Sequence, residues 1–389
     1  METRQNNRAI ASLVFARMIY AINWLNIGAI FVLLEPDLGS GVGGLGTLTS
    51  AFYLGIGLMQ LPGGVLAARW GAKNTVVLGI FLSSFSALGT AVASSIPVFT
   101  ILRFIVGSGM ALVFAPGVVI IARLLSGERT GTGVGLLNSA YDVGGVVGIF
   151  GWVVLATITG WRPSLALSGG LGVATGVIVL ATVPQDAPSE DFRVDPLMLR
   201  RIIADKQLIL LGLATFGLSI GNIVVSSFMG YYAVKTFGIP TTLGGAIQGL
   251  VVAVPIFAAY LAGRVYDGSE RPRALMALAV LGGSMALVLG AYPNVWSAVV
   301  CSALDGVASG LGFTVAFAGA KDLNRAGDRY AGLAVAWVNC ISLTGSFLTP
   351  LVYSFLVVSA SYAVGWLGCA AISFGFLVPA LLMSKRFRP

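Results

Sequence analysis

The chain of 389 residues is 57% hydrophobic and only 10% charged, whereas a soluble globular protein carries about 25% charged residues. Histidine is absent and the three cysteines stand in no metal-ligand spacing, which disfavours a metal centre, a bound cofactor and histidine-based acid–base chemistry. The sequence also contains no phosphate-binding loop and no nucleophile–base pair, so an enzyme is not expected. The composition instead indicates a protein surrounded by lipid.

Twelve apolar segments follow one another along the chain, each of about the length that a bilayer-spanning helix needs. In chain order they are Ala9–Leu34, Leu45–Ala68, Thr75–Ala93, Val98–Leu124, Gly133–Thr157, Ser164–Val183, Leu208–Ala233, Leu243–Ala262, Ala274–Gly290, Val295–Ala318, Leu333–Val358 and Ala363–Met383. A longer polar stretch separates six spans from six. We therefore predict an all-α membrane protein with an N-terminal six-helix domain over residues 1–183, a cytoplasmic linker over 184–207 and a C-terminal six-helix domain over 208–389.

The basic residues predict the orientation of these spans. With the N-terminus inside the cell, Arg162 and Lys235 fall outside and Arg17 and Arg103 fall within spans, while the rest of the 23 lysines and arginines lie on the cytoplasmic side. Both termini are then cytoplasmic, and the multi-pass chain is expected in the plasma membrane. The same asymmetry accounts for the net charge of +8 without a nucleic-acid partner.

The two halves of the chain share a pattern, which indicates duplication. Residues 63–73 read GGVLAARWGAK and residues 262–273 read AGRVYDGSERPR, and each stands between two apolar segments as a glycine-rich, basic turn. Further matches recur at nearly the same separation: Asn23 with Asn222, Arg103 with Asp305, and Glu128-Arg129 with Asp328-Arg329. A six-span unit repeated in one orientation gives two pseudo-symmetric domains, an architecture typical of secondary transporters.

With these features the chain resembles the major facilitator superfamily over nearly its whole length. The turn after the second span of that family reads roughly G-x-x-x-D-R-x-G-R-R. The first copy matches at Gly64, Arg69, Gly71 and Lys73, with Ala68 at the acidic position, and the second copy keeps Gly263, Asp267, Arg271 and Arg273. The family's R-x-x-x-G-x-G of span four is present as Arg103, Gly107 and Gly109.

The resemblance implies two six-helix domains around a central cavity that opens alternately to the two sides of the membrane. It also implies that Arg69, Lys73 and Asp267 form a latch at a cytoplasmic gate, weakened in the first half by Ala68. Drug/proton antiporters of this superfamily carry a Gly-Pro pair in span five. Residues 138–145 contain no proline and carry an acid, Asp142, which disfavours drug efflux.

Four charged residues lie within predicted spans, where each charge costs roughly 2.5–3.5 kcal/mol on insertion scales. Arg17 and Arg103 are suited to an anionic substrate, because the guanidinium fork can hold two oxygens. Asp142 and Asp305 are suited to carry a proton, because an apolar cavity favours the protonated carboxyl and a nearby arginine favours the ionised one. A substrate anion that competes for the arginine would then couple uptake to protons. The alternative is that the four charges form fixed ion pairs that hold the helices in register.

Polar and aromatic residues at similar depths are candidates to line a substrate cavity, although intramembrane amides also join helices. They are Tyr20, Asn23, Trp24, Asn138, Tyr141, Asn222, Ser226, Gln248, Trp337 and Asn339. Residues 35–37, which read Glu-Pro-Asp, are expected to form a solvated external turn.

The favoured hypothesis is a secondary active transporter, a monomer in the lipid bilayer that takes up a small organic anion such as a carboxylate together with protons. The alternative is a proton-antiport exporter of amphipathic drugs or metabolites. A receptor that transports nothing is disfavoured, because the sequence carries no soluble sensory domain. Two positive and two negative charges within the spans leave the choice between uptake and export open.

Overall fold

The computed structural model describes residues 2–125, 130–185, 196–323, 331–384 and 387. Within these ranges every regular element is a helix, and twelve helical segments are long and apolar enough to cross a membrane, as predicted. The repeated pairs Glu128-Arg129 and Asp328-Arg329 and part of the predicted linker lie outside the described residues. The chain forms two compact units, Met1–Phe192 and Arg193–Pro389, named unit 1 and unit 2 below.

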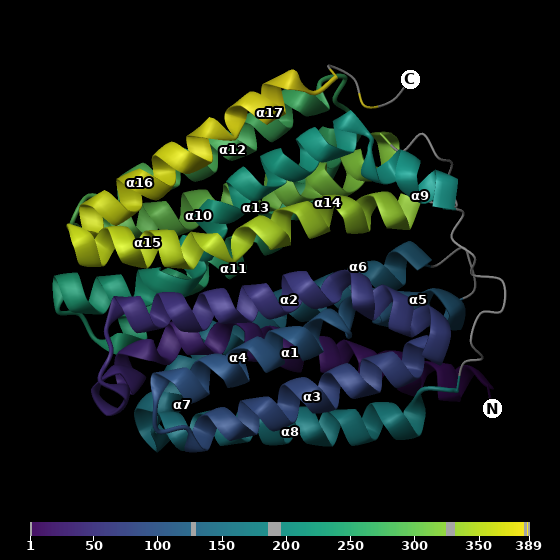
Figure 1. Ribbon diagram of the computed structural model, residues 1–389, viewed down its shortest axis with the longest axis horizontal. Coiled ribbons are helices and arrows are strands. Elements are labelled where there is room, and N and C mark those ends of the chain that lie inside the picture. The colour runs from purple at the N-terminus through teal and green to yellow at the C-terminus, as the bar shows by residue number, and fades with distance from the viewer. Residues whose placement is uncertain (1, 126–129, 186–195, 324–330, 385–386, 388–389) are drawn as a thin grey trace. The chain divides into compact units, whose positions relative to one another are not determined.

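Unit 1 holds the first six spans (Figure 1). Its helices are α1 (Glu2–Leu38), α2 (Val42–Trp70), α3 (Ala72–Val92), α4 (Ile96–Ala111), α5 (Phe114–Leu124), α6 (Thr130–Val146), the π-helix η2 (Val147–Gly151), α7 (Trp152–Thr159) and α8 (Trp161–Thr182). Helix α1 packs against α6 and α8, α2 packs against α4, and α3 packs against α4 and α8.

Unit 2 holds the last six spans and a short helix before them (Figure 1). Its helices are α9 (Pro196–Ile203), α10 (Lys206–Phe237), α11 (Thr241–Asp267), α12 (Pro272–Gly290), α13 (Val295–Leu323), α14 (Ala331–Ser346), α15 (Leu348–Ser359), α16 (Tyr362–Gly375) and α17 (Leu377–Leu382). Helix α10 packs against α11, α13 and α14, while α13 packs against α11 and α12. Helix α9 lies within the stretch that the sequence pattern assigned to a linker.

Several spans contain an interruption that the hydrophobic pattern does not reveal. Span four divides between α4 and α5, and span twelve divides at Phe376 between α16 and α17. Span five contains the π-helix Val147–Gly151, and span eleven is interrupted at Phe347. The irregularities of spans five and eleven occupy matching places in the two halves, so the repeat extends to backbone geometry. Local π turns in a helix often accompany functional sites.

Close helix packing in each unit depends on residues without a Cβ. A Cβ at Gly55 or at Gly107 would overlap a backbone carbonyl oxygen of the facing helix, so α2 and α4 approach one another only because glycine stands at both places. In unit 2, a Cβ at Gly306 would lie 2.9 Å from the Cβ of Val254. The α11–α13 contact therefore repeats the α2–α4 contact, as small-xxx-small pairs predict for helices in lipid.

The first basic turn is shorter than the sequence suggested. Helix α2 continues to Trp70 and α3 begins at Ala72, so Gly71 alone connects them, with a φ of 94° that favours glycine. The second copy has a longer connection, since α11 ends at Asp267 and α12 begins at Pro272. The repeat conserves the position of the turn and not its length.

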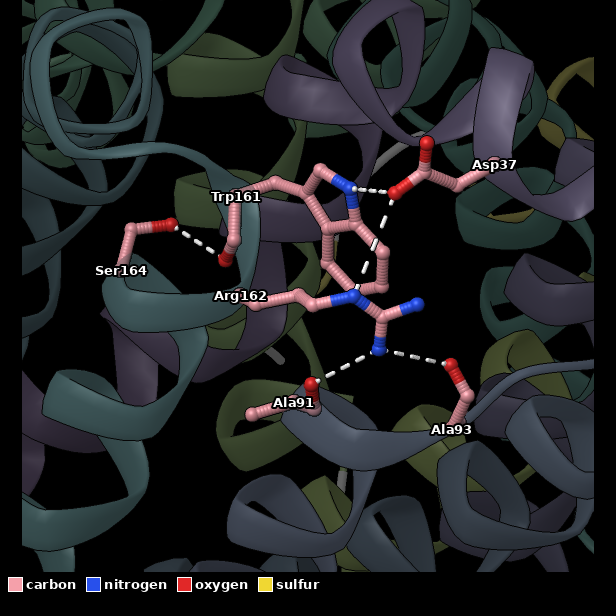
Figure 2. Close-up of polar contacts among 6 residues, drawn as sticks. All are labelled: Asp37, Ala91, Ala93, Trp161, Arg162 and Ser164. Atoms are coloured by element: carbon pink, nitrogen blue, oxygen red, sulfur yellow. Dashed lines mark hydrogen bonds and ion pairs between the residues drawn. The ribbon is translucent and has the colours of Figure 1, made fainter.

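The expectation of an external turn at residues 35–37 is wrong, because α1 continues to Leu38. Pro36 is tolerated there because a proline near the end of a helix removes only one hydrogen bond of the last turns. Asp37 is also held by a partner: Trp161 donates its Nε1–H to Asp37 Oδ2 at 2.9 Å (Figure 2).

Arg162 completes this contact at the same end of unit 1. Its Nε lies 3.9 Å from Asp37 Oδ2, and its Nη1 donates to the carbonyl oxygens of Ala91 and Ala93 at 3.1 Å each (Figure 2). The guanidinium also lies over the ring of Trp161, 4.1 Å from its centroid. The cluster ties the ends of α1 and α3 to the start of α8.

Candidate functional site

A guanidinium enclosed by aromatic rings lies inside unit 1. The Cζ of Arg17 lies 4.3 Å from the ring centroid of Tyr20, 4.2 Å from that of Phe114 and 4.6 Å from that of Tyr141. These four residues are called the Arg17 cage below. Helix α1 supplies Arg17 and Tyr20, which share a helix face because they stand three residues apart, while α5 supplies Phe114 and α6 supplies Tyr141.

The rings attract the guanidinium but do not satisfy its hydrogen-bonding groups. Arg17 is 9% exposed, and its Nε and Nη1 are buried without a hydrogen-bond partner among the described residues. An aromatic face stabilises a cation through its quadrupole and accepts no ordinary hydrogen bond. A buried, charged donor of this kind is costly unless an acceptor arrives. The cage therefore leaves two buried nitrogens of a charged group without an acceptor among the described residues.

Trp24 extends the aromatic wall beside the cage. Its ring centroid lies 5.5 Å from that of Tyr20 and 6.0 Å from that of Tyr141, and its Nε1–H donates to Tyr53 Oη at 3.3 Å. Tyr20, Trp24 and Tyr141, which were singled out on depth alone, thus lie together.

Asp142 follows Tyr141 on α6 and is half-buried. The positive charge of Arg17 acts electrostatically on this carboxylate. Between these two described residues, however, no nitrogen of Arg17 lies within 4.0 Å of a carboxylate oxygen, the limit for an ion pair. Asn138, one turn earlier on α6, is exposed. The two opposite charges thus act on each other without a described hydrogen bond or ion pair between them.

Asn23 lies apart from the cage and joins two helices. Its Nδ2 donates to the carbonyl oxygen of Ile19 at 3.1 Å and to that of Ser168 at 3.5 Å. The amide therefore links α1 to α8 within unit 1.

Arg103 differs from Arg17, because two of its nitrogens donate to backbone carbonyl oxygens, although its Nε is also buried without a partner among the described residues. It is 4% exposed, its Nη1 donates to the carbonyl oxygen of Asn23 at 3.0 Å, and its Nη2 donates to that of Trp24 at 3.4 Å. Its Cζ also lies 4.3 Å from the ring centroid of Phe52. Arg103 thus connects α4 to α1 and α2, and its position fits a structural role better than substrate binding.

In unit 2, Asp305 and Asn222 lie in one hydrogen-bonded cluster. Asn222 Nδ2 donates to Ser309 Oγ at 3.2 Å, and Ser309 Oγ donates to Asp305 Oδ2 at 3.4 Å. Asp305 is 0% exposed, and its Oδ1 has no partner among the described residues. The sequence repeat had paired Asp305 with Arg103, but the two residues have unlike surroundings.

Gln248 and Ser226 also meet in unit 2, where they join α11 to α10. Gln248 is 0% exposed; its Nε2 donates to the carbonyl oxygen of Ser226, and its Oε1 accepts from the backbone N–H of Gly230 at 2.9 Å. Both ends of this amide are occupied by backbone groups, which favours a packing role over substrate binding.

Trp337 and Asn339 lie on α14, and neither belongs to the hydrogen-bonded cluster of Asp305 and Asn222. Trp337 packs against the apolar core of unit 2, and its Nε1 is buried without a hydrogen-bond partner in the described structure. Asn339 is half-buried. The structure gives neither residue a described contact with Asp305 or Gln248.

The predicted gate residues lie at helix ends. Arg69 is exposed in the last turn of α2, Lys73 is 8% exposed at the start of α3, and Asp267 is the exposed last residue of α11. Beside Asp267, Tyr266 donates its hydroxyl to Asp322 Oδ2 at 2.8 Å. A latch formed by these residues stays a prediction.

Sequence reasoning missed Phe114 and Asp322. Phe114 carries no polar atom and stands directly after the break in span four, a break that the hydrophobic pattern does not reveal. Asp322 stands at the end of α13, where a charged residue reads as a solvated helix end. A search for tyrosines near acidic residues could have found the contact between Tyr266 and Asp322. No sequence signal, in contrast, indicates that Phe114 contacts Arg17.

Comparison with known proteins identifies the family. The model described as Major Facilitator Superfamily matches residues 13–267. The chain is 32% identical over 163 residues to a "probable galactarate/D-glucarate transporter" of Escherichia coli, covering 39% of this chain and 35% of that protein. It is 26% identical to the 4-hydroxybenzoate transporter of Pseudomonas aeruginosa, over 41% of this chain and 36% of that protein. The matched part thus spans about a third of the length of these relatives.

A drug-resistance protein and a solved structure also match. The chain is 28% identical to the quinolone resistance protein NorA of Staphylococcus aureus, over 60% of this chain and 63% of that protein. A crystal structure of the nucleoside transporter NupG superposes with a TM-score of 0.79 at 14% sequence identity and covers 98% of this chain and 100% of that chain. At this identity the structural likeness concerns the fold.

Proposed function

Because the chain belongs to the Major Facilitator Superfamily and is a membrane transporter rather than an enzyme, we propose that it takes up a small organic anion, a carboxylate, by proton-coupled symport. Transport would proceed by alternating access of a monomer in the plasma membrane, with both termini in the cytoplasm. The observation that carries the proposal is the Arg17 cage, a buried guanidinium whose Nε and Nη1 have no acceptor among the described residues. Several relatives are named as transporters of organic anions, glucarate and 4-hydroxybenzoate among them, which supports an anionic substrate.

The cage suits a planar anion that binds at the N–H groups of Arg17. The ring centroids of Tyr20, Phe114 and Tyr141 lie within 4.6 Å of the Arg17 Cζ, so the rings occupy the space around the cation. A carboxylate can use the edge of the guanidinium, since its two oxygens match the fork of N–H donors. The rings of Tyr20 and Tyr141 contact Arg17, and their hydroxyls could donate to further oxygens of a hydroxy acid.

Asp142 supplies the proposed link to protons. A carboxylate bound at Arg17 would bring a second negative charge close to Asp142, while it would screen Asp142 from the positive charge of Arg17. Both effects favour a protonated Asp142. Substrate and proton would then enter together, and release of one would promote release of the other. The buried Asp305, which the sequence analysis also assigned to protons, has no arginine near it in the described part of unit 2.

Uptake into proteoliposomes tests this proposal. The purified full chain is reconstituted with an inward proton gradient and offered radiolabelled glucarate, 4-hydroxybenzoate and simple monocarboxylates. We expect accumulation of at least one of them, lost in Arg17→Gln and not restored by Arg17→Lys, because lysine lacks the planar fork. The matched control is Arg264→Gln, since Arg264 also lies over a tyrosine ring, 4.7 Å from the centroid of Tyr260, but at an exposed position.

A separate variant tests whether Asp142 couples transport to protons. In Asp142→Asn we expect substrate to equilibrate down its gradient without accumulating against it when a proton gradient is applied. Proton-driven accumulation at the parental level in this variant would show that Asp142 does not carry the coupled proton. Anion uptake that survives Arg17→Gln would contradict the anion-binding role of the cage.

Export of amphipathic compounds by proton antiport is the second candidate function. The match to the quinolone resistance protein NorA covers more of the chain than the anion-transporter matches do. The aromatic wall of Tyr20, Trp24 and Tyr141 could also stack against a planar drug. Everted vesicles given ethidium in the medium discriminate the two functions: proton-driven dye uptake into the vesicles that Asp142→Asn abolishes, in a protein that accumulates no carboxylate, would favour export.

A further inference from the structure

Asp305 presents a carboxylate without a counter-charge in the interior of unit 2. It lies in α13 and is 0% exposed, and its Oδ1 has no hydrogen-bond partner among the described residues. Placing an ionised carboxylate in an apolar interior is strongly unfavourable unless a positive charge compensates it. The surroundings of this residue must therefore account for its charge.

No cationic side chain of the described part of unit 2 can reach it. The lysines and arginines described there all lie in α9 or at the ends of helices: Arg200, Arg201, Lys206, Lys235, Arg264, Arg271, Arg273 and Lys321. Lys321 shares α13 with Asp305, but at 1.5 Å per residue it lies roughly 24 Å along the helix axis. The described part of unit 2 thus supplies no positive side chain to compensate the charge of Asp305.

The carboxylate belongs to a group of buried oxygen atoms. Ser302, Asp305 and Ser309 stand on one face of α13, since they are three and four residues apart. Ser309 Oγ contacts both Asp305 Oδ2 and the amide of Asn222, whereas Ser302 Oγ, at 0% exposure, has no partner among the described residues. Two buried oxygens one helical turn apart, Ser302 Oγ and Asp305 Oδ1, are thus unoccupied.

The backbone of α10 leaves space for this carboxylate at a glycine. A Cβ at Gly221 would overlap Asp305 Oδ1, and one at Gly283 of α12 would lie 3.8 Å from the same atom. Asp305 thus stands where three helices of unit 2 meet, and only glycine at position 221 leaves room for its oxygen.

We propose that the cluster of Ser302, Asp305, Ser309 and Asn222, called the Asp305 cluster below, is a binding site for a small monovalent cation such as sodium. The donor atoms are carboxylate and hydroxyl oxygens, which are ligands of hard cations. The amide of Asn222 donates its Nδ2–H to Ser309 Oγ and so holds that hydroxyl in place. A single positive charge balances the single carboxylate, whereas a divalent ion would leave a buried excess charge. The described residues contain no group of three or more His, Cys, Asp or Glu side chains that would suit a transition metal.

The site is separate from the Arg17 cage, which belongs to unit 1. The sodium proposal therefore does not rest on the substrate or on the direction of transport. Its test measures binding and stability of the protein without substrate, so its outcome is independent of the anion experiments above.

The test compares sodium chloride with choline chloride at constant ionic strength, on the purified full chain in lipid nanodiscs. We expect sodium to raise the melting temperature in a saturable way, because a ligand that binds only the folded state stabilises it. Equilibrium dialysis with radioactive sodium should give one bound ion per chain. Asp305→Asn, which has the same shape and no charge, should abolish both signals while remaining folded.

Further variants separate a binding role from a general loss of packing. Ser302→Ala should weaken the apparent sodium affinity by about tenfold, the effect typical of losing one supporting oxygen. Gly221→Ala should also abolish binding, because its methyl group would displace Asp305 Oδ1. Ser284→Ala is the matched control, since Ser284 is a buried serine of unit 2 bonded to Ser373 Oγ at 2.9 Å, outside the Asp305 cluster. Its sodium response should equal that of the parent.

Two results would overturn the proposal. One is an identical melting curve in sodium and in choline together with no bound radioactive sodium. The other is an infrared carbonyl band of a protonated carboxylic acid that persists in saturating sodium and disappears in Asp305→Asn. The second result would show that a proton, and not sodium, neutralises the carboxylate.

Discussion

The two arginines inside unit 1 are expected to respond to the same substitution in opposite ways. Arg103 donates to the carbonyl oxygens of Asn23 and Trp24 and lies over the ring of Phe52. Hydrogen bonds from charged donors contribute about 1.5–3 kcal/mol each and a ring contact about 1 kcal/mol. The substitution also removes the free-energy cost of burying a charge, which offsets part of this loss. For Arg103→Gln we expect a net destabilisation of about 2–3 kcal/mol.

Arg17 has the ring contacts without the hydrogen bonds. Arg17→Gln would lose three aromatic neighbours but would also remove a buried cation whose Nε and Nη1 have no acceptor among the described residues. These contributions offset one another, and we expect the free energy of unfolding to change by less than about 1 kcal/mol. Transport, in contrast, should be lost. Substitution of a substrate-binding residue should thus abolish transport without lowering stability, whereas substitution of a structural residue should lower stability.

Thermal unfolding of the purified protein measures the difference. For a unit of this size, 1 kcal/mol shifts the melting temperature by about 2–4 °C. Arg103→Gln should then melt roughly 5–10 °C below the parent, and Arg17→Gln within roughly 3 °C of it. Bound carboxylate should raise the melting temperature of the parent and of Arg103→Gln, but not that of Arg17→Gln. If Arg17→Gln melted as low as Arg103→Gln, Arg17 would be a fixed structural group and the reasoning would be refuted.

Four further predictions concern single residues. Arg162→Gln should destabilise unit 1 by about 1–2 kcal/mol, because two backbone carbonyls lose a charged donor. Asp37→Asn should cost less than about 1 kcal/mol, because its contact with Arg162 is long and half-exposed; equal shifts in melting temperature would contradict this. Gln248→Leu should lower the melting temperature by several degrees, because the N–H of Gly230 loses its acceptor, and an unchanged value would exclude the contact. Asp267→Asn should favour the inward-open state, and equal labelling of single-cysteine probes on both membrane faces in variant and parent would argue against a latch.

The fold could be predicted because it depends on properties that the sequence displays directly. Segment length and hydropathy define twelve spans, and the predicted and observed boundaries differ by only a few residues. The breaks within spans were not predictable in the same way. The π-helix at Val147–Gly151 lies inside apolar sequence without a proline, where a change of hydrogen-bonding register alters no side-chain pattern. The interruption at Phe347 stands three residues before Pro350, which lacks the N–H that would bond to the carbonyl of Ser346, but the hydrophobic pattern alone does not display it.

The candidate site was predictable only in part, because contacts between spans depend on how each helix is rotated. The pairing of Arg17 with Tyr20 follows from their spacing on one helix, whereas Phe114 enters the cage from α5 after an unpredicted break. Depth in the membrane placed Gln248 beside other candidates, but rotation turns its amide onto the backbone of α10. Composition indicates which residues need a partner, and the partner itself comes from packing.

The duplicated frame explains why equivalent positions carry opposite charges. In both units the fourth span packs closely against the second through glycines, so the two scaffolds offer similar sites along that helix. In unit 1 the position holds Arg103, which faces the helix α1 and finds backbone carbonyl oxygens there. In unit 2 it holds Asp305, which faces the corresponding helix α10 at a glycine and at Asn222. Carbonyl oxygens can satisfy a cation without further ligands, but an anion in the same place requires a cation from outside. The architecture is repeated, and the requirement for an added charge is confined to one half.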